Sequence, residues 1–454
     1  MIELSRENVL TEKAGLAARV LTCLNQQIPN PTVSTPEIIN PTVINPIWWW
    51  VPGRVEVFGK HTDYGGGPSI VGALPRGFLI AGRKRDDGVV RVRDSGDQSV
   101  FELNLETGVT IPAEVTGWRR YVNVLARRLR RDFPGAPIGA DLALGSDLPR
   151  ASGMSSSSAL VVGVANALIT LAGINRRPDF LSAIRTDADL GGYFGCLENG
   201  LTFGPFPGDG GVGTFGGSED QTAIVCSKPG HLSAFTYMPV RHVADVALPA
   251  GWVFVFASSG IAAEKAGRAQ GLYNRASLGV RTLMDLWRAH AGPLESLTAA
   301  MAADPDVVAR LHTIIDAQRA DGWTAEELHT RLTHFSREVP RVAEAIQAFS
   351  RGDAESLGRL SDESHRDADQ LLKNQLPETN ALVSIARAQG AFAASAFGAG
   401  FGGSVWALVE PTTLGQTVEA FGEKWLAAYR AKFPEHAAKS SHFAARPGIP
   451  LTEL

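Results

Sequence analysis

The sequence predicts an α+β protein of two domains. The chain has 454 residues, too many for one ordinary hydrophobic core and enough for two or three domains. Strand-like and helical segments are mixed in both halves, which is typical of α+β architecture. The character of the sequence changes near residues 239–249, after which long helices dominate. We therefore expect an N-terminal extension over 1–47, a first domain over 48–240 and a second over 241–454.

The composition excludes several classes of protein. Hydrophobic residues make up 44% of the chain and charged residues 20%, with a net charge of −4, so the chain lacks the basic character of a nucleic-acid-binding protein. The arginines of 119–131 are interpreted as a solvated helix face. The three cysteines, Cys23, Cys196 and Cys226, show no paired spacing, which fits a reducing compartment. No signal peptide or membrane span is evident, so we expect a cytoplasmic protein without a membrane partner.

The first half begins with a helix and an arm. Apolar residues at helical spacing predict a helix over residues 10–25, and the segment 26–47, rich in Pro, Asn and Thr, predicts a loop or extended arm. Alternating valines between two glycines predict a strand over 53–59, followed by a polar loop at 60–67. Since polar loops on rigid strands often carry function, this loop is a candidate part of the site.

The remaining elements follow from the same patterns. Further strands are expected at 70–71, 77–83, 89–93, 100–105, 139–144 and 252–258. Helices are expected at 118–132, 159–171, 181–190, 276–291, 307–317, 325–335, 341–349, 357–372 and 417–433. A glycine loop runs into a strand within 393–409, and the last residues form a polar tail. The segment 202–217 is almost entirely Gly, Pro, Phe and Thr, which predicts a mobile loop.

One stretch of the sequence predicts an anion-binding helix N-terminus. Residues 148–159 read Leu-Pro-Arg-Ala-Ser-Gly-Met-Ser-Ser-Ser-Ser-Ala and lead into a helix, so the serines lie at a helix N-terminus, where free N–H groups attract anions. A phosphate cradle would consist of Gly153, Ser155, Ser156, Ser157 and Ser158. No lysine follows the glycine, so the stretch is not a P-loop. A serine-rich helix cap without a ligand is the alternative.

Three separated motifs together resemble the GHMP kinase superfamily, and the first resembles its galactokinase branch. That branch has Gly-Arg-x-Asn-Leu-Ile-Gly-Glu-His-x-Asp-Tyr, where this chain reads Gly53-Arg54-Val55-Glu56-Val57-Phe58-Gly59-Lys60-His61-Thr62-Asp63-Tyr64. The second motif, Pro-x-Gly-x-Gly-Leu-Ser-Ser-Ser-Ala, corresponds to residues 149–158 with two replacements. The third, Gly-Ala-Gly-Phe-Gly-Gly, is intact at 398–403.

The resemblance implies a fold and a reaction. The fold would combine an N-terminal domain like ribosomal protein S5 domain 2 with a C-terminal ferredoxin-like domain, with the active site between them. The reaction would transfer the γ-phosphoryl group of ATP to the anomeric hydroxyl of a sugar, which requires positioning and charge neutralisation. The partners would be a small sugar and ATP, and the protein would be a monomer or weak dimer.

The resemblance also assigns residues to the nucleotide and the metal. The serine loop would hold the phosphates, and the hydroxyl of Ser157 would bind Mg²⁺. Glu198 is the candidate carboxylate ligand. Its spacing to Asp220 is longer than expected for the family, because residues 204–217 look inserted, so Glu219 is the alternative ligand.

The resemblance places the acceptor chemistry on Asp220 and Arg54. Asp220 would accept or orient the proton of the sugar hydroxyl, and Arg54 would keep its carboxylate ionised. A structural ion pair is the alternative. The residues expected to bind the sugar are Lys60, His61, Asp63, Tyr273 and Gly400. The alternative interpretation of His61 is an ordinary loop residue, and that of the loop containing Gly400 is a plain turn.

Two departures from the motif bear on the substrate. Glu56 stands where the family has Asn, and Lys60 stands where it has an acidic residue that contacts the hydroxymethyl end of the hexose. A lysine there would suit an anionic sugar such as galacturonate, since an unpaired ammonium is unfavourable in a cleft. Alternatively, Lys60 pairs with Glu56 or another carboxylate and the substrate is galactose. An inactive sugar sensor also remains open, whereas a mevalonate or homoserine kinase would not explain residues 61–64.

Overall fold

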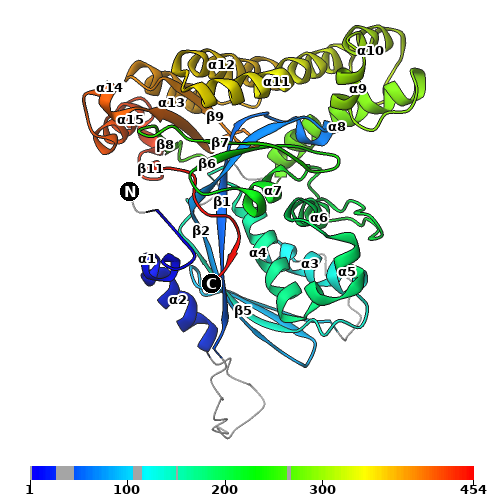
Figure 1. The fold of residues 1–454 in the computed structure, drawn as a ribbon, viewed down its shortest axis with the longest axis vertical. Helices are drawn as coiled ribbons and strands as arrows, with labels where there is room; N and C mark the ends of the chain where they lie inside the picture. The colour runs from blue at the N-terminus through cyan, green and yellow to red at the C-terminus, as the bar shows by residue number, and fades with distance from the viewer. Residues whose placement is uncertain (1–2, 27–44, 106–114, 150–151, 263–266) are drawn as a thin grey trace, which may run out of the picture.

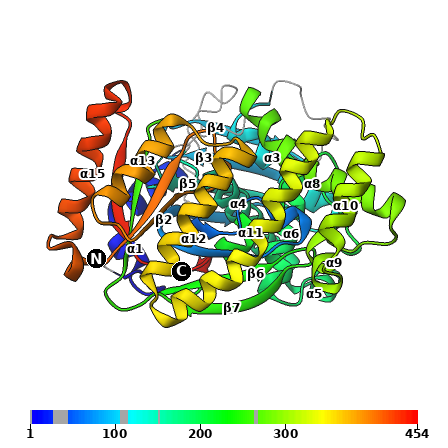
Figure 2. The same ribbon diagram turned by 90° about the horizontal axis from the view of Figure 1, so that it is seen from above.

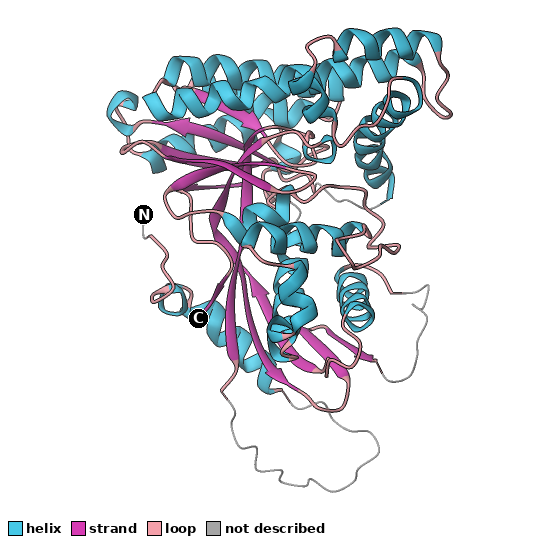
Figure 3. Ribbon diagram, turned by 45° about the vertical axis from the view of Figure 1, so that its right-hand side comes forward, coloured by secondary structure: helices cyan, strands magenta, loops and turns pink. Residues whose placement is uncertain are grey.

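The computed structural model describes residues 3–26, 45–105, 115–149, 152–262 and 267–454. These residues form two β-sheets that pack against helices (Figures 1 and 3). The predicted α+β architecture in two domains is confirmed. In the described part of the chain, no helix has both the length and the apolar character needed to cross a bilayer.

The first sheet has eight strands. Its main path runs β12-β1-β2-β5-β3-β4, and β6 and β7 extend it from β2. The strands are β1 (Ile47–Phe58), β2 (Ser69–Lys84), β3 (Val89–Asp94), β4 (Val100–Asn104), β5 (Ala140–Ser146), β6 (His231–Thr236), β7 (Arg241–Ala247) and β12 (Thr452–Glu453). The segments expected as separate strands at 70–71 and 77–83 are one strand, β2, which pairs with β1 along its length.

Helices cover both faces of this sheet. One face carries α3 (Trp118–Asp132), α4 (Ser156–Leu171), α5 (Pro178–Ala183), α6 (Asp187–Asn199) and α7 (Glu219–Cys226), and the other carries α1 (Val9–Glu12) and α2 (Ala14–Asn25) (Figure 1). The alternation of β1 explains this arrangement, because Trp49 belongs to the core under α4 while Trp50 packs with α2. The described part of the N-terminal extension is therefore a packed layer of the first domain. The arm expected over 26–47 lies largely outside the described residues.

The helix expected at 181–190 is wrong, because the chain breaks into α5 and α6 there. Thr186 caps α6 by accepting a hydrogen bond from the N–H of Asp189, whose side chain in turn accepts from the Thr186 N–H. This capping box starts a new helix in the middle of the apolar pattern.

The second sheet is antiparallel with the order β11-β8-β10-β9. Its strands are β8 (Val253–Ser258), β9 (Ala393–Ala396), β10 (Ser404–Val409) and β11 (Ser441–Ala445). Its outer face packs on α13 (Pro377–Ala388) and α15 (Val418–Lys432), and α14 (Pro411–Leu414) follows β10. Phe254, Phe256 and Trp406 face the other way and join the core of the first domain.

A layer of long helices lies across both sheets (Figure 2). It comprises α8 (Gly267–His290), α9 (Leu297–Ala303), α10 (Val307–Ala317), α11 (Ala325–Arg351) and α12 (Ala354–Asp367), with a π-helical turn at Ala368–Leu372. The two helices expected at 325–335 and 341–349 are one helix, α11, with Pro340 inside it. Phe335, Val342 and Phe349 are buried on either side of the proline, so packing maintains the helix despite the lost N–H donor.

The polar tail expected at the end of the chain instead contains two strands. β11 pairs with β8, and β12 pairs with the start of β1, where the N–H of Leu454 donates to the carbonyl of Trp48 at 2.9 Å. The first sheet thus takes β7 and β12 from beyond the expected boundary at residue 240.

Candidate active site

A polar pocket lies where β1, the loop after it, α4, α6, α7, α8 and the glycine loop 398–403 meet. It holds about 480 Å³ of space not filled by protein atoms, part of which is open solvent. Eight of the residues expected in the site line it, namely Arg54, His61, Asp63, Ser158, Glu198, Asp220, Tyr273 and the alternative ligand Glu219. Those that do not are Lys60, Gly153, Ser155, Ser156, Ser157 and Gly400.

Arg54 connects three parts of the site. Its guanidinium donates to Oδ1 of Asp220 at 2.7 Å and, through Nη1, to the carbonyl of Gly153 at 2.7 Å. Ser158 Oγ donates to the other carboxylate oxygen of Asp220 at 3.2 Å. Burial alone would lower the pKa of Arg54, but Asp220, Glu219 and nearby Glu56 raise it above its usual value. The guanidinium is therefore a fixed positive charge between the serine loop and α7.

The N-terminus of α4 has free hydrogen-bonding capacity. Ser155 precedes the helix in the left-handed region, with φ of 57°, and its side chain makes no capping hydrogen bond. Its Oγ is buried and has no hydrogen-bond partner among the described residues. The first N–H groups of a helix also lack intrahelical acceptors. A buried orphan hydroxyl beside free N–H groups fits an anionic phosphate, and Gly153, with φ of 75°, keeps the approach free of a side chain.

The carboxylates of the pocket fit a hard cation. Glu198 Oε2 accepts a hydrogen bond from Gln221 Nε2 at 2.5 Å, and Glu198 and Ser158 both face the pocket. Hydroxyl and carboxylate oxygens are the ligands that Mg²⁺ prefers. Ser157, the expected hydroxyl ligand, is half-buried outside the pocket lining. Burial and then the charges of Glu56 and Asp63 raise the pKa of Glu219 well above its usual value.

His61 is held in one orientation. Its φ of 56° lies in the left-handed region, and Asn374 Nδ2 donates to its Nε2 at 3.1 Å. Because Nε2 accepts, the ring proton lies on Nδ1 and is donated to the hydroxyl of Tyr64. Tyr273, the other expected sugar residue on this side, has its ring centre 6.0 Å from that of His61.

Lys60 does not face the pocket, which corrects the expectation that it binds the substrate. Its side chain is fully buried and Nζ donates to Ser364 Oγ at 2.8 Å. Ser364 in turn donates to Glu338 Oε1 at 2.9 Å, and the same oxygen accepts from the N–H groups of Gly59 and Lys60. Burial lowers the pKa of Lys60, an effect that Glu338 and Glu56 oppose. The ammonium therefore links the loop after β1 to α12 and, through Ser364, to α11.

Glu56 lines the pocket and fixes the glycine loop. Its Oε2 accepts from the N–H of Gly398 at 2.7 Å. Burial raises the pKa of Glu56 to about 7, against the lowering effects of Arg54 and Lys60. Gly400 lies behind this surface, where a Cβ would come within 2.4 Å of the carbonyl of Asn374. Its role in the structure is close backbone packing.

Three residues of the site carry no sequence signal. Asn374 orients His61, while Asn199 and Asn274 hold the glycine-rich segment beside the pocket. Single asparagines occur in many loops and helices, so neither spacing nor periodicity distinguishes these three.

Three family models and several curated proteins match the chain in sequence. Residues 42–84 match the galactokinase galactose-binding signature, 120–194 the GHMP kinases N terminal domain and 345–427 the GHMP kinases C terminal domain. The galactokinase of Streptomyces coelicolor is 27% identical over 395 residues, covering 84% of this chain and 89% of that protein. The galactokinase of Chloroflexus aggregans is 29% identical over 373 residues, covering 81% of this chain and 85% of that protein.

Solved structures share the fold. The crystal structure of Lactococcus lactis galactokinase complexed with galactose superposes with a TM-score of 0.71 at 22% identity, covering 90% of this chain and 95% of that one. The mevalonate kinase of Methanococcus jannaschii gives a TM-score of 0.56 at 15% identity, covering 90% of this chain and 100% of that one.

The two-domain fold and the serine loop define a GHMP kinase, and the chain carries both domains of that family. Within it, the galactose-binding signature over the strand and loop of Arg54 and His61 identifies a sugar kinase of the galactokinase type, an enzyme class that uses ATP.

Proposed function

We propose that the chain transfers the γ-phosphoryl group of ATP to the anomeric hydroxyl of galactose or a closely related neutral hexose. The observation that carries this proposal is the position of Asp220. Its carboxylate lines the pocket, is held by Arg54 and contacts Ser158 on the first turn of α4. A proton acceptor thus lies beside an anion-binding helix end, as phosphoryl transfer to a hydroxyl requires.

The serine loop is the proposed phosphate site. The N–H groups of Ser156, Ser157 and Ser158 and the orphan hydroxyl of Ser155 would donate to the phosphates of ATP. Bound Mg²⁺ would neutralise the charge on the phosphates. Ser158 and Glu198, which share the pocket lining, are its proposed ligands in place of the expected pair of Ser157 and Glu198.

Asp220 and Arg54 are the proposed catalytic residues. Asp220 accepts the proton of the anomeric hydroxyl, and Arg54 keeps the carboxylate ionised and fixed. His61, Asp63 and Tyr273 are proposed to bind the other sugar hydroxyls, because they surround the same pocket with two rings and a carboxylate. The tautomer of His61 is already set by Asn374 and Tyr64.

Charge favours a neutral sugar over galacturonate. Arg54 is the only lysine or arginine among the described residues that line the pocket, and it is paired with Asp220. Five carboxyl groups line the same pocket: Glu56, Asp63, Glu198, Glu219 and Asp220. With Lys60 bonded to Ser364, a uronate carboxylate would meet no available cation in this lining.

The test is an assay of ADP and sugar phosphate with Mg·ATP and, separately, galactose or galacturonate, run beside Asp220→Asn. We expect phosphorylation of galactose at the anomeric position and a loss of about 100-fold or more in the variant. Faster turnover of galacturonate would overturn the neutral-sugar assignment. ATP binding without turnover of any sugar would instead support a sensor.

We further propose that the enzyme works in the cytoplasm as a monomer or weak dimer. Its three cysteines are free, which suits a reducing compartment that also supplies ATP. Sedimentation across a range of concentrations would test the oligomeric state.

A further inference from the structure

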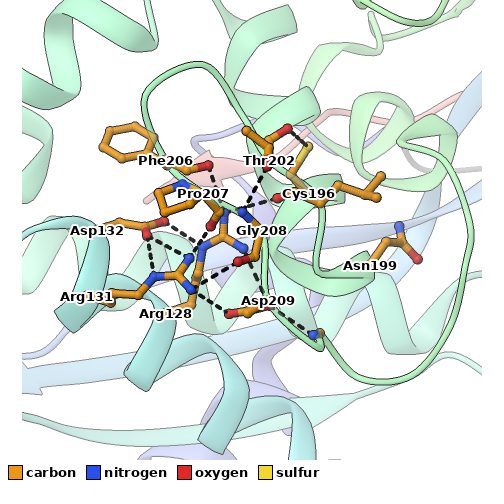
Figure 4. Close-up of polar contacts among 12 residues, drawn as sticks. Arg128, Arg131, Asp132, Cys196, Asn199, Thr202, Phe206, Pro207, Gly208 and Asp209 are labelled. Atoms are coloured by element: carbon orange, nitrogen blue, oxygen red, sulfur yellow. Dashed lines mark hydrogen bonds and ion pairs between the residues drawn. The ribbon is translucent and has the colours of Figure 1, made fainter.

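The segment 201–217, which contains the expected mobile loop 202–217, has two parts with different surroundings. Its first part, residues 201–209, is here called the arm, and residues 211–217 are called the cover. The arm is fixed to α3 by two arginines (Figure 4). Arg128 Nη2 donates to the carbonyl of Leu201 at 3.1 Å, and Arg131 Nη1 donates to the carbonyl of Gly208 at 3.3 Å.

The arm is also fixed by burial. The Arg128 side chain is fully buried and donates through Nε to Asp132 at 2.7 Å, where the hydroxyl of Tyr193 donates as well. Phe206 packs with its ring centre 4.9 Å from that of Phe133 and 5.5 Å from that of Tyr193. The arm is therefore packed against α3 and α6, while its mobility stays a prediction.

The cover forms a wall of the proposed sugar pocket. Thr214, Gly216 and Gly217 line the pocket together with Tyr273. A Cβ on Gly217 would lie 2.1 Å from Oδ2 of Asp63, and one on Gly216 would lie 2.7 Å from the hydroxyl of Tyr273. The backbone of the cover thus rests directly on the two side chains, and a side chain at either position would have to displace Asp63 or Tyr273.

Two asparagines on different helices are hydrogen-bonded to the cover. Asn199, at the end of α6, accepts from the N–H of Gly216 at 2.8 Å and from Thr214 Oγ1 at 3.1 Å. Asn274, on α8, accepts from the N–H of Phe215 at 3.0 Å and donates to the carbonyl of Gly213 at 3.2 Å. Asn274 lies next to Tyr273 but is absent from the pocket lining among the described residues.

We propose that the cover seals the acceptor side of the pocket against water and that Asn274 is the positioning residue that keeps it closed. In the productive reaction the sugar oxygen forms the new P–O bond, the bond from the γ-phosphorus to ADP breaks, and the sugar proton goes to Asp220. With the cover open, a water oxygen forms the P–O bond in place of the sugar oxygen, ADP leaves as before and the water proton goes to Asp220, so the product is inorganic phosphate. Closed sites suppress this side reaction. The inference rests on the proposed function.

The experiment compares Asn274→Ala with Arg275→Ala. Arg275 is the next residue on α8, and its exposed ion pair with Glu327 lies outside the pocket lining. ADP and galactose phosphate are measured in the same reaction. For Asn274→Ala we expect the KM for galactose to rise about tenfold, the KM for ATP to stay unchanged and the ratio of ADP to sugar phosphate to exceed that of the wild type by about twofold or more. Arg275→Ala should match the wild type.

The outcomes separate the two proposals. If the wild type makes no sugar phosphate, the proposed function fails. If the wild type makes it and both variants keep its product ratio and KM values, the cover inference is wrong. Asn274→Asp retains the acceptor for the Phe215 N–H and loses the donor to Gly213, so it should give an intermediate ratio. It provides the same test should Asn274→Ala not fold, and a ratio equal to that of the wild type would overturn the inference.

Discussion

The guanidinium of Arg54 donates to the carboxylate of Asp220 at 2.7 Å across 166 residues of sequence. The same guanidinium donates to the carbonyl of Gly153, so one side chain sets the distance between the proposed base and the serine loop. Arg54 makes these bonds from different nitrogens of its planar fork, whereas a lysine would have to reach both acceptors from one nitrogen.

We therefore expect Arg54→Lys to lower kcat by about 100-fold while the protein remains folded. Steady-state kinetics and a thermal melt check this together. Lys84→Arg, a change at an exposed ion pair with Asp86, is the control and should leave both measurements unchanged. Wild-type turnover in Arg54→Lys would show that the double contact is not needed.

Ser155→Gly tests the phosphate site through opposite effects on stability and binding. Glycine adopts the φ of 57° without the steric cost that serine bears, so we expect the melting temperature to stay level or rise. The buried orphan hydroxyl is lost at the same time, so the KM for ATP should rise about tenfold. An unchanged KM for ATP would remove Ser155 from the nucleotide site.

Glu56→Gln should stabilise the protein more at high pH than at low pH. Burial raises the pKa of Glu56 to about 7 from 4.5, so the folded protein holds this proton more tightly than the unfolded chain does. The contribution of Glu56 to the free energy of unfolding is therefore largest below pH 4.5. It falls as the pH rises to 7, where the buried carboxylate becomes charged. Glutamine keeps an acceptor for the Gly398 N–H without that titration.

Denaturant titrations at pH 5 and pH 8 measure this effect. The gain from Glu56→Gln should be larger at pH 8, by up to about 3 kcal/mol in the free energy of unfolding. A gain that is the same at both pH values would mean that Glu56 titrates normally in the fold.

Lys60→Met should affect stability and leave substrate choice unchanged. The ammonium points to Ser364 beneath the pocket, so its removal should lower the free energy of unfolding by about 1–3 kcal/mol through a lost buried hydrogen bond. The ratio of kcat/KM for galactose to that for galacturonate should not change. A tenfold change in that ratio would restore Lys60 to the substrate site.

The sequence predicted those parts of the molecule that depend on local pattern. The helix at 118–132 and the strand of Arg54 follow from periodicity, and the motif resemblance brought Arg54 and Asp220 together although they are distant in the chain. Neither periodicity nor the motif could predict the direction in which the Lys60 side chain points. The register of β1 shifts between Glu56 and Phe58, and Gly59 has φ of 95°, so the alternation that aims Arg54 and Glu56 at the pocket stops before Lys60.

Other features depend on contacts that no local pattern records. Pro340 would end an isolated helix, but apolar packing on both sides carries α11 through it. The short strand β12 has only two residues, and its identity as a strand depends on the free edge of β1. The hydrogen bonds of Asn199 and Asn274 to the cover likewise form only because the fold brings α6 and α8 beside it.

The pairing of β12 with β1 bears on how the protein is made. On the ribosome, β1 emerges early and can pair with β2, but Trp49 and Trp50 have no strand partner on the opposite edge until residues 452–453 are synthesised. An open strand edge is a site of unwanted association between nascent chains. The start of the strand that carries Arg54 therefore gains its second sheet partner from a segment about 400 residues further along the chain.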